Sequence, residues 1–121
     1  GVNDLAKGGE VERYISDLND TIRVIYNFNQ NSTIVLAKIT LTGKENINGR
    51  IETFNEGIEG LGTSWKNKGY SMIVVDMANA LTYPEDYSDE IHPNAQGYKK
   101  MADIWYNALV TVLKPCEQEE E

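Results

Sequence analysis

The sequence predicts an α/β protein in which helices cover a parallel sheet. Segments with the apolar period of amphipathic helices alternate along the chain with short runs of β-branched and apolar residues. Those runs are almost continuously apolar, which is typical of strands covered by helices on both faces, whereas half-exposed strands alternate. Helices and strands that alternate in this way form layered folds with right-handed crossovers.

After an opening turn, the first half of the chain predicts a helix, a strand and a second helix. The first helix is expected from residue 10 to about 29, with Val11, Ile15, Leu18, Ile22 and Ile25 along one face. Residues 33–41 (TIVLAKITL) predict a strand buried on both faces. The second helical pattern runs over residues 47–65, and its glycines at 57, 60 and 62 weaken it toward its end.

The second half predicts a strand, a long loop and a final helix. Residues 70–76 (YSMIVVD) form the second buried strand, and residues 77–89 form a polar loop. A helix over residues 95–113 follows, with Asn94 as its N-cap and Pro115 ending it. Its expected apolar face carries Tyr98, Met101, Ala102, Trp105, Leu109 and Val112. Because parallel sheets place their sites at the carboxyl ends of strands, we expect the functional residues in the loop after the second strand.

Asp89 ends that loop, and the only histidine of the chain, His92, follows it by three residues. An imidazole can move a proton near neutral pH, and a carboxylate beside it can orient the ring and stabilise the imidazolium. A lone histidine is more often structural or simply exposed. The pair by itself therefore leaves a structural and a catalytic interpretation open.

The net charge and the cysteine content limit the kinds of molecule that this chain is expected to bind. The chain has 121 residues and a net charge of -8, so we expect one domain that binds neither nucleic acid nor anionic membranes, both of which favour Lys and Arg. A neutral or polar substrate fits better. Cys116 is the single cysteine, which leaves no disulfide or zinc cluster, and we expect neither metal nor cofactor. The acidic residues 114–121 are expected to form a frayed tail.

The opening residues and two sequons bear on localisation. Residues 1–4 (GVND) are polar and do not begin with Met, which indicates no signal peptide here and a processed protein or a piece of a longer one. Asn19 and Asn31 begin N-glycosylation sequons. These short motifs also arise by chance, and they favour secretion only weakly.

Two segments together resemble the SGNH (GDSL-type) hydrolase superfamily. Residues 1–4 are similar to its G-x-N-D block, and residues 89–92 (DEIH) are similar to its D-x-x-H block. The flanking segments HPNAQGYKKMADIWYNAL (residues 92–109) and VVDMANAL (residues 74–81) are similar to secreted carbohydrate esterases of the acetylxylan-esterase type. The resemblance covers essentially the whole chain, as one partial hydrolase domain over residues 1–121.

This resemblance implies the C-terminal half of a flavodoxin-like three-layer α/β/α fold with parallel strands. It implies that His92 acts as general base and then general acid, and that Asp89 orients it. Asn3 would donate to the oxyanion. The implied reaction is serine-type hydrolysis of an ester, such as an acetyl group on a carbohydrate, in a secreted protein.

The chain departs from the family pattern in its nucleophile, because no Gly-Asp-Ser block is present. Its serines are Ser16, Ser32, Ser64, Ser71 and Ser88. We therefore expect the nucleophile outside this sequence and the chain to be inactive alone, ordered only beside an N-terminal half or copies of itself. The alternative is a non-catalytic structural or self-assembling subunit derived from the hydrolase fold. A flavodoxin-like binding domain is disfavoured, because no Gly-rich phosphate loop opens a helix.

Overall fold

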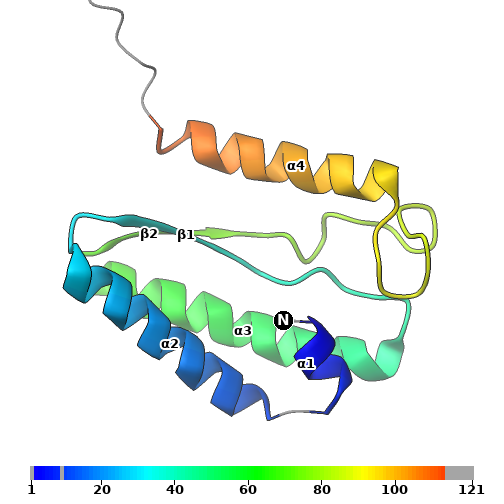
Figure 1. Cartoon of the computed structure of the whole chain (residues 1–121), viewed down its shortest axis with the longest axis horizontal. Helices are drawn as coiled ribbons and strands as arrows, with labels where there is room; N and C mark the ends of the chain where they lie inside the picture. The colour runs from blue at the N-terminus through cyan, green and yellow to red at the C-terminus, as the bar shows by residue number, and fades with distance from the viewer. Residues whose placement is uncertain (1, 9, 114–121) are drawn as a thin grey trace, which may run out of the picture.

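The structure, a computed structural model, describes residues 2–8 and 10–113. Its helices and strands form three layers, in which α2 and α3 lie on one side of a small sheet and α4 lies on the other (Figure 1). In chain order the elements are α1 (Val2–Ala6), α2 (Val11–Phe28), β1 (Thr33–Ala37), α3 (Glu45–Asn67), β2 (Ser71–Val75) and α4 (Ala95–Val110). The predicted α/β order and parallel sheet are confirmed, and the expected opening turn is instead the short helix α1.

The sheet is parallel and has two strands within the described residues, with β1 and β2 paired in register from end to end. Successive side chains point to opposite faces, so alternate positions meet α2 and α3. The side chains on that face are Ile34, Leu36, Met72 and Val74. The prediction that both strands are buried on both faces is wrong, because most residues of β1 are only half-buried. The helices cover one face closely and the opposite face loosely.

The core lies between α2, α3 and the sheet, in two clusters. One cluster contains Leu5, Ile47, Ile51, Phe54 and Ile58, and the other contains Ile22, Tyr26, Trp65 and Met72. The indole N–H of Trp65 donates to Asn19 at 2.9 Å, which joins α2 to α3. Asn19 therefore takes part in a helix interface, whereas Asn31 is exposed after the end of α2.

β1 ends four residues earlier than residues 33–41 predict. The amide of Asn55, a buried residue of α3, accepts from the Ile39 N–H at 2.7 Å and donates to the Ile39 carbonyl at 2.9 Å. A side-chain amide thus satisfies the backbone groups that another strand would otherwise bind. This pair of bonds turns the chain away from the sheet toward α3.

The glycines expected to weaken the second helix do not shorten it, and α3 continues to Asn67. A Cβ built on Gly57 would lie 2.6 Å from Ile15 of α2, and one on Gly62 would collide with Val74 of β2. These two glycines allow close approach of neighbouring elements, which compensates for their low helix propensity.

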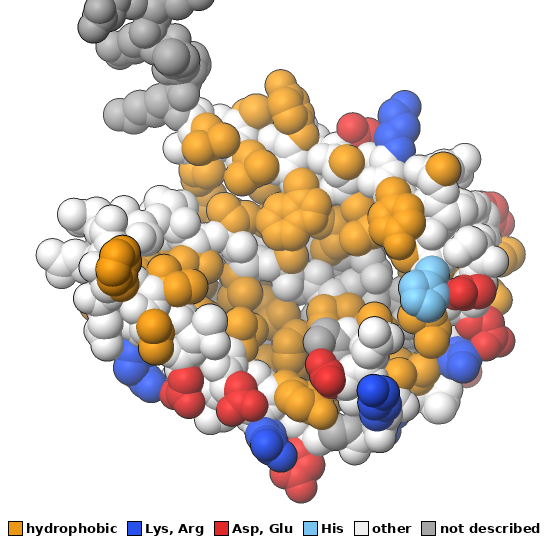
Figure 2. Space-filling model, viewed as in Figure 1, with side chains coloured by type: hydrophobic (Ala, Val, Ile, Leu, Met, Phe, Trp, Pro, Cys, Tyr) orange, Lys and Arg blue, Asp and Glu red, His pale blue; other side chains and the backbone are white. Residues whose placement is uncertain are grey.

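α4 contributes little to the core. Gly97 is its one buried residue, and the expected apolar face remains largely open. Tyr106 is 67% exposed and Leu113, just after the helix, is 65% exposed. Figure 2 shows apolar side chains gathered over α4 and in the hollow below it. Contiguous exposed apolar patches of this kind are typical of interaction sites.

Candidate active site

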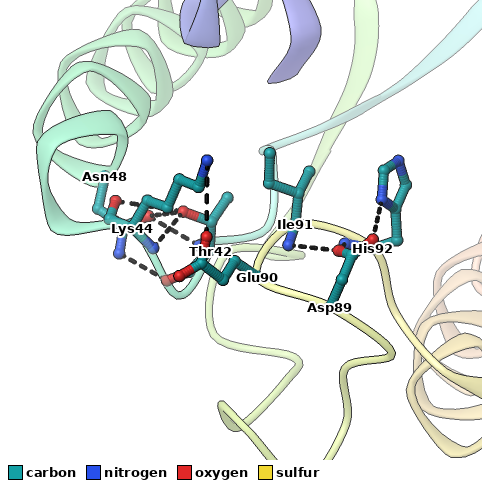
Figure 3. A network of polar contacts seen from close by, with 7 residues as sticks. All are labelled: Thr42, Lys44, Asn48, Asp89, Glu90, Ile91 and His92. Atoms are coloured by element: carbon teal, nitrogen blue, oxygen red, sulfur yellow. Dashed lines mark hydrogen bonds and ion pairs between the residues drawn. The ribbon is translucent and has the colours of Figure 1, made fainter.

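Asp89 and His92 form a closed turn in the loop between β2 and α4 (Figure 3). One carboxylate oxygen of Asp89 accepts the backbone N–H of His92 at 2.6 Å and that of Ile91 at 2.7 Å. The other oxygen lies 2.8 Å from Nδ1 of His92. The same carboxylate thus shapes the turn and holds the ring, which a spacing of three residues permits.

The charge state of Asp89 follows from these bonds. The backbone N–H of His92, the backbone N–H of Ile91 and the His92 ring hold the pKa of Asp89 down to about 2. Asp89 is therefore ionised near neutral pH, and an ionised carboxylate only accepts hydrogen bonds. In the neutral imidazole Nδ1 must then carry the proton, which leaves the lone pair on Nε2. Both side chains are open to solvent, His92 by 62% and Asp89 by 58%.

The turn is fixed to its neighbours on two sides. On one side, the Ser88 backbone N–H donates to the His92 carbonyl at 2.8 Å, and the Ser88 hydroxyl donates to the same oxygen at 3.1 Å. On the other side, Gly43 N–H donates to the Glu90 carbonyl at 2.7 Å, and the Tyr87 hydroxyl donates to the Leu41 carbonyl. The loop after β1 and the loop after β2 are joined here.

The loop after β1 is itself rigid. Asn48 of α3 accepts the Thr42 N–H at 2.7 Å and donates to the Thr42 carbonyl at 2.8 Å (Figure 3). Lys44 follows, with its ammonium 3.6 Å from the carboxylate of Glu90. A hollow of about 250 Å³ is lined by Lys44, Asp89, Glu90, Ile91 and His92. One basic side chain, Lys44, and two acidic side chains, Asp89 and Glu90, thus border the space beside the ring.

Asn3 lies on α1, a helix that packs against the same core cluster as Ile91 of this turn. Leu5 of α1 is buried, and Ile91 packs against the same cluster of core residues. The two motifs, far apart in sequence, therefore share one hydrophobic cluster, against which Leu36 of β1 and Val74 of β2 also pack. Asn3 is exposed, and its side chain forms no hydrogen bond with His92 among the described residues. Gly1, the first residue of the motif, lies outside them.

No serine hydroxyl hydrogen-bonds the His92 ring within residues 2–8 and 10–113, which include all five serines of the chain. Ser64 is exposed in α3. Ser88 is adjacent to the turn, but its hydroxyl donates to the carbonyls of His92 and Pro93. The ring and its carboxylate are therefore present without a nucleophile from these serines.

Two features of this site were missed in the sequence. Asp86, three residues before Asp89, is fully buried and binds Lys100 of α4, and Asn48 orders the loop after β1. The pattern Gln96-x-x-x-Lys100 places two donors on one face of a helix and could have indicated a buried carboxylate partner.

Other sites are less suited to this chemistry. A hollow of about 350 Å³ beside α3 is lined by Lys38, Asn55, Glu59, Asp76 and neighbouring residues, but neither His92 nor Asp89 borders it. Lys38 is already paired with Glu59 at 2.9 Å. In the part of the chain that the structure describes, no three His, Cys, Asp or Glu side chains group as metal ligands, and no helix could cross a membrane. Cys116 and the acidic residues 114–121 lie outside that part.

Comparisons with known proteins relate the chain to one family of hydrolases. The family profile described as GDSL-like Lipase/Acylhydrolase matches residues 1–105. A multidomain esterase from Ruminococcus flavefaciens is 31% identical over 124 residues, which cover 97% of this chain and 16% of that protein. The chain therefore spans a small part of this curated relative.

Solved structures share the fold over about half of their length. A family 3 carbohydrate esterase from Clostridium thermocellum has a TM-score of 0.74 at 24% identity, covering 91% of this chain and 52% of that chain. A point mutant of an acetyl esterase, crystallised with an acetate ion, has a TM-score of 0.77 at 21% identity, covering 93% and 55%. A GDSL-like lipase from Bacteroides thetaiotaomicron has a TM-score of 0.64 at 15% identity, covering 93% and 60%. The predicted partial SGNH hydrolase fold is confirmed.

Proposed function

Since the chain belongs to the GDSL-like lipase/acylhydrolase family, we propose that it is the base-bearing part of a serine-type ester hydrolase that deacetylates a carbohydrate. His92 is the general base, Asp89 orients it, and Asn3 is the oxyanion donor. The observation that carries this proposal is the 2.8 Å contact between His92 Nδ1 and an Asp89 carboxylate that two backbone N–H groups already orient.

The chemistry follows from the protonated Nδ1. The free lone pair on Nε2 takes the hydroxyl proton of a serine while the serine oxygen bonds to the ester carbonyl carbon. The carbonyl oxygen becomes negative, and the Asn3 amide N–H donates to it. When the C–O bond to the alcohol breaks, the imidazolium gives its proton to the departing oxygen. Water then attacks the acyl-serine by the same route, releasing acetic acid and restoring the serine.

The serine comes from a complementary half-fold beside β1. Because α2 and α3 lie on the same side of the sheet (Figure 1), right-handed crossovers put the strand before α2 on the edge of β1 opposite β2. That edge and the open apolar surface of α4 favour an N-terminal half of the fold as the partner. Copies of this chain are the alternative occupant.

The substrate class rests on three observations. The similar proteins include a carbohydrate esterase and an acetyl esterase by description. The net charge of -8 disfavours polyanions, and Lys44 and Glu90 beside the ring offer a donor and an acceptor to sugar hydroxyls. A secreted location is part of this proposal, since extracellular polysaccharides carry such esters.

The experiment joins this chain to the half-fold that carries the nucleophile and measures acetate release from acetylated xylan. Hydrolysis that requires both parts, and that a serine-reactive phosphonate abolishes, supports the proposal. His92→Gln is the chain-side control. An assembly that is folded and releases no acetate from any ester contradicts the proposal.

A second candidate function is a non-catalytic structural or self-assembling subunit. The observation that favours it is that no serine among the described residues reaches the His92 ring. In this case the chain forms a stable oligomer of itself, and no serine in that oligomer reacts with the phosphonate.

A further inference from the structure

Asp86 is the most enclosed ionisable group in the described part of the chain, with a side chain that is 0% exposed. One carboxylate oxygen accepts the backbone N–H of Thr82 at 2.8 Å and the Lys100 ammonium at 2.8 Å. The other accepts the side-chain amide of Gln96 at 2.8 Å. A carboxylate with three donors is strongly held, and it binds α4 to the loop that precedes it.

The backbone of Asp86 holds the far end of the same loop. Its carbonyl accepts the N–H of Asn94 at 2.9 Å, and its own N–H donates to Thr82 at 3.0 Å. The Asn94 side chain caps α4 through Gly97 N–H at 2.9 Å. A Cβ on Gly97 would collide with the Asp86 carbonyl, so helix and loop are in direct contact. Residues 87–93, which include the Asp89–His92 turn, are therefore closed at their base, because Asp86 precedes them and binds Asn94, the residue that follows them.

We propose that Asp86 is a positioning residue for the Asp89–His92 pair. It contacts neither ring nor substrate. It fixes the turn relative to α4 by holding both ends of residues 87–93, and so sets where His92 Nε2 lies with respect to the serine. This inference rests on the proposed function, since it assigns a role within the same site.

The low pKa of Asp86 agrees with the geometry. The Lys100 ammonium, then the Thr82 N–H, hold the pKa of this carboxyl down to about 2. The group is therefore an anion near neutral pH. Lys100 is 44% exposed at its side chain, so it can be replaced without opening the core.

Asp86→Asn tests the proposal in the assembled protein, because it keeps the shape and removes the charge. The expected result is a fall in kcat of about 10- to 100-fold with KM within about twofold, since a misplaced catalytic group slows chemistry more than binding. The matched control is Glu85→Gln, a neighbouring exposed carboxylate whose side chain makes no hydrogen bond or ion pair among the described residues. Its kcat should equal that of the unaltered protein.

A spectroscopic measurement separates positioning from simple loss of stability. The ¹⁵N shifts of His92, identified by their loss in His92→Gln, report which ring nitrogen carries the proton. Asp86→Asn should reduce the Nδ1–H form, whereas Glu85→Gln should retain it. A folded Asp86→Asn protein with unchanged kcat and unchanged ¹⁵N shifts overturns the proposal.

Lys100→Met serves if Asp86→Asn does not fold, because it removes one partner from a half-exposed helix position. Lys100→Met should lower kcat, though less than Asp86→Asn does, and Lys100→Arg should have the kcat of the unaltered protein. Equal kcat in Lys100→Met and Lys100→Arg, with unchanged ¹⁵N shifts, contradicts the role of Asp86. If the unaltered assembly hydrolyses no ester, the proposed function fails, and the ¹⁵N comparison still decides whether Asp86 positions the ring.

Discussion

The Nδ1 atom of His92 lies 2.8 Å from a carboxylate oxygen of Asp89, and the other oxygen of that carboxylate accepts the His92 backbone N–H at 2.6 Å. One side chain thus fixes the backbone and the ring of the same residue. The ring therefore has little freedom to leave its partner, even though both groups are exposed to solvent. This arrangement suits a base that must keep one tautomer through repeated proton transfers.

Loss of either member of the pair should lower activity in the assembled protein. His92→Gln should reduce kcat to the level of residual catalysis, and Asp89→Asn should lower it by about 10²- to 10⁴-fold because the wrong tautomer is favoured. Steady-state hydrolysis of an acetyl ester measures both. Asp103→Asn on α4 is the charge-matched control, and it should leave kcat unchanged. Equal rates in Asp89→Asn and the control would exclude the orienting role.

Asn3→Ala should lower kcat by about 10²- to 10³-fold, as expected for one oxyanion donor. The side chain is exposed, so the thermal midpoint should change little. Asn46→Ala, at another exposed asparagine, is the control for amide loss. A fall in kcat that accompanies an equal fall in thermal stability would indicate a structural role for Asn3 instead.

The turn should resist acid. The pKa of both Asp89 and Asp86 is held down to about 2, below the ordinary aspartate value of about 3.9. Groups with a lowered pKa stabilise the folded state fully above the ordinary value, and this stabilisation is lost as the pH falls through about 2. The side-chain carboxyl ¹³C resonances of Asp89 and Asp86 should therefore show their protonation shift only between about pH 4 and 2. A carboxyl protonation shift centred above about pH 4 in the unaltered protein would contradict the assignment.

Two glycines of α3 should respond in opposite ways to alanine. Gly62→Ala should destabilise the fold by about 1–3 kcal/mol, because the new Cβ meets Val74 in the packed core. Gly60→Ala meets nothing within 4 Å and should stabilise the helix by about 0.5–1 kcal/mol. Urea unfolding of the assembled protein measures both. A Gly62→Ala variant that is as stable as the unaltered protein, or more stable, would refute close approach at Gly62.

The isolated chain should not behave as a stable monomer. Its two-stranded sheet and the exposed apolar side chains of α4 leave surface that a partner must cover. Size-exclusion chromatography should give oligomers or aggregate for the 121 residues alone, and a one-to-one complex when the nucleophile half is added. A cooperative monomer at micromolar concentration would refute this dependence. Tyr106→Lys, on the exposed face of α4, should weaken the complex.

The sequence alone determined the features that depend on residues close together in the chain. The period of the apolar residues predicts α2, α3, α4 and both strands, because burial on one side of a helix or sheet imposes that period. Asp89 and His92 could be paired without a structure because three residues of one turn bring them together. Asn94 could be recognised as the cap of α4 for the same reason.

Tertiary structure decided the contacts between residues far apart in the chain. Asn55 ends β1 at Ala37 by binding Ile39, and Leu5 and Ile91 bring the Asn3 helix and the Asp89–His92 turn to one cluster. Asp86 meets Lys100 because α4 packs back over the loop that leads into it. These pairings depend on how the layers approach one another, which no local period encodes. The contacts of these side chains are set by the elements packed around them in three dimensions and not by their neighbours in sequence.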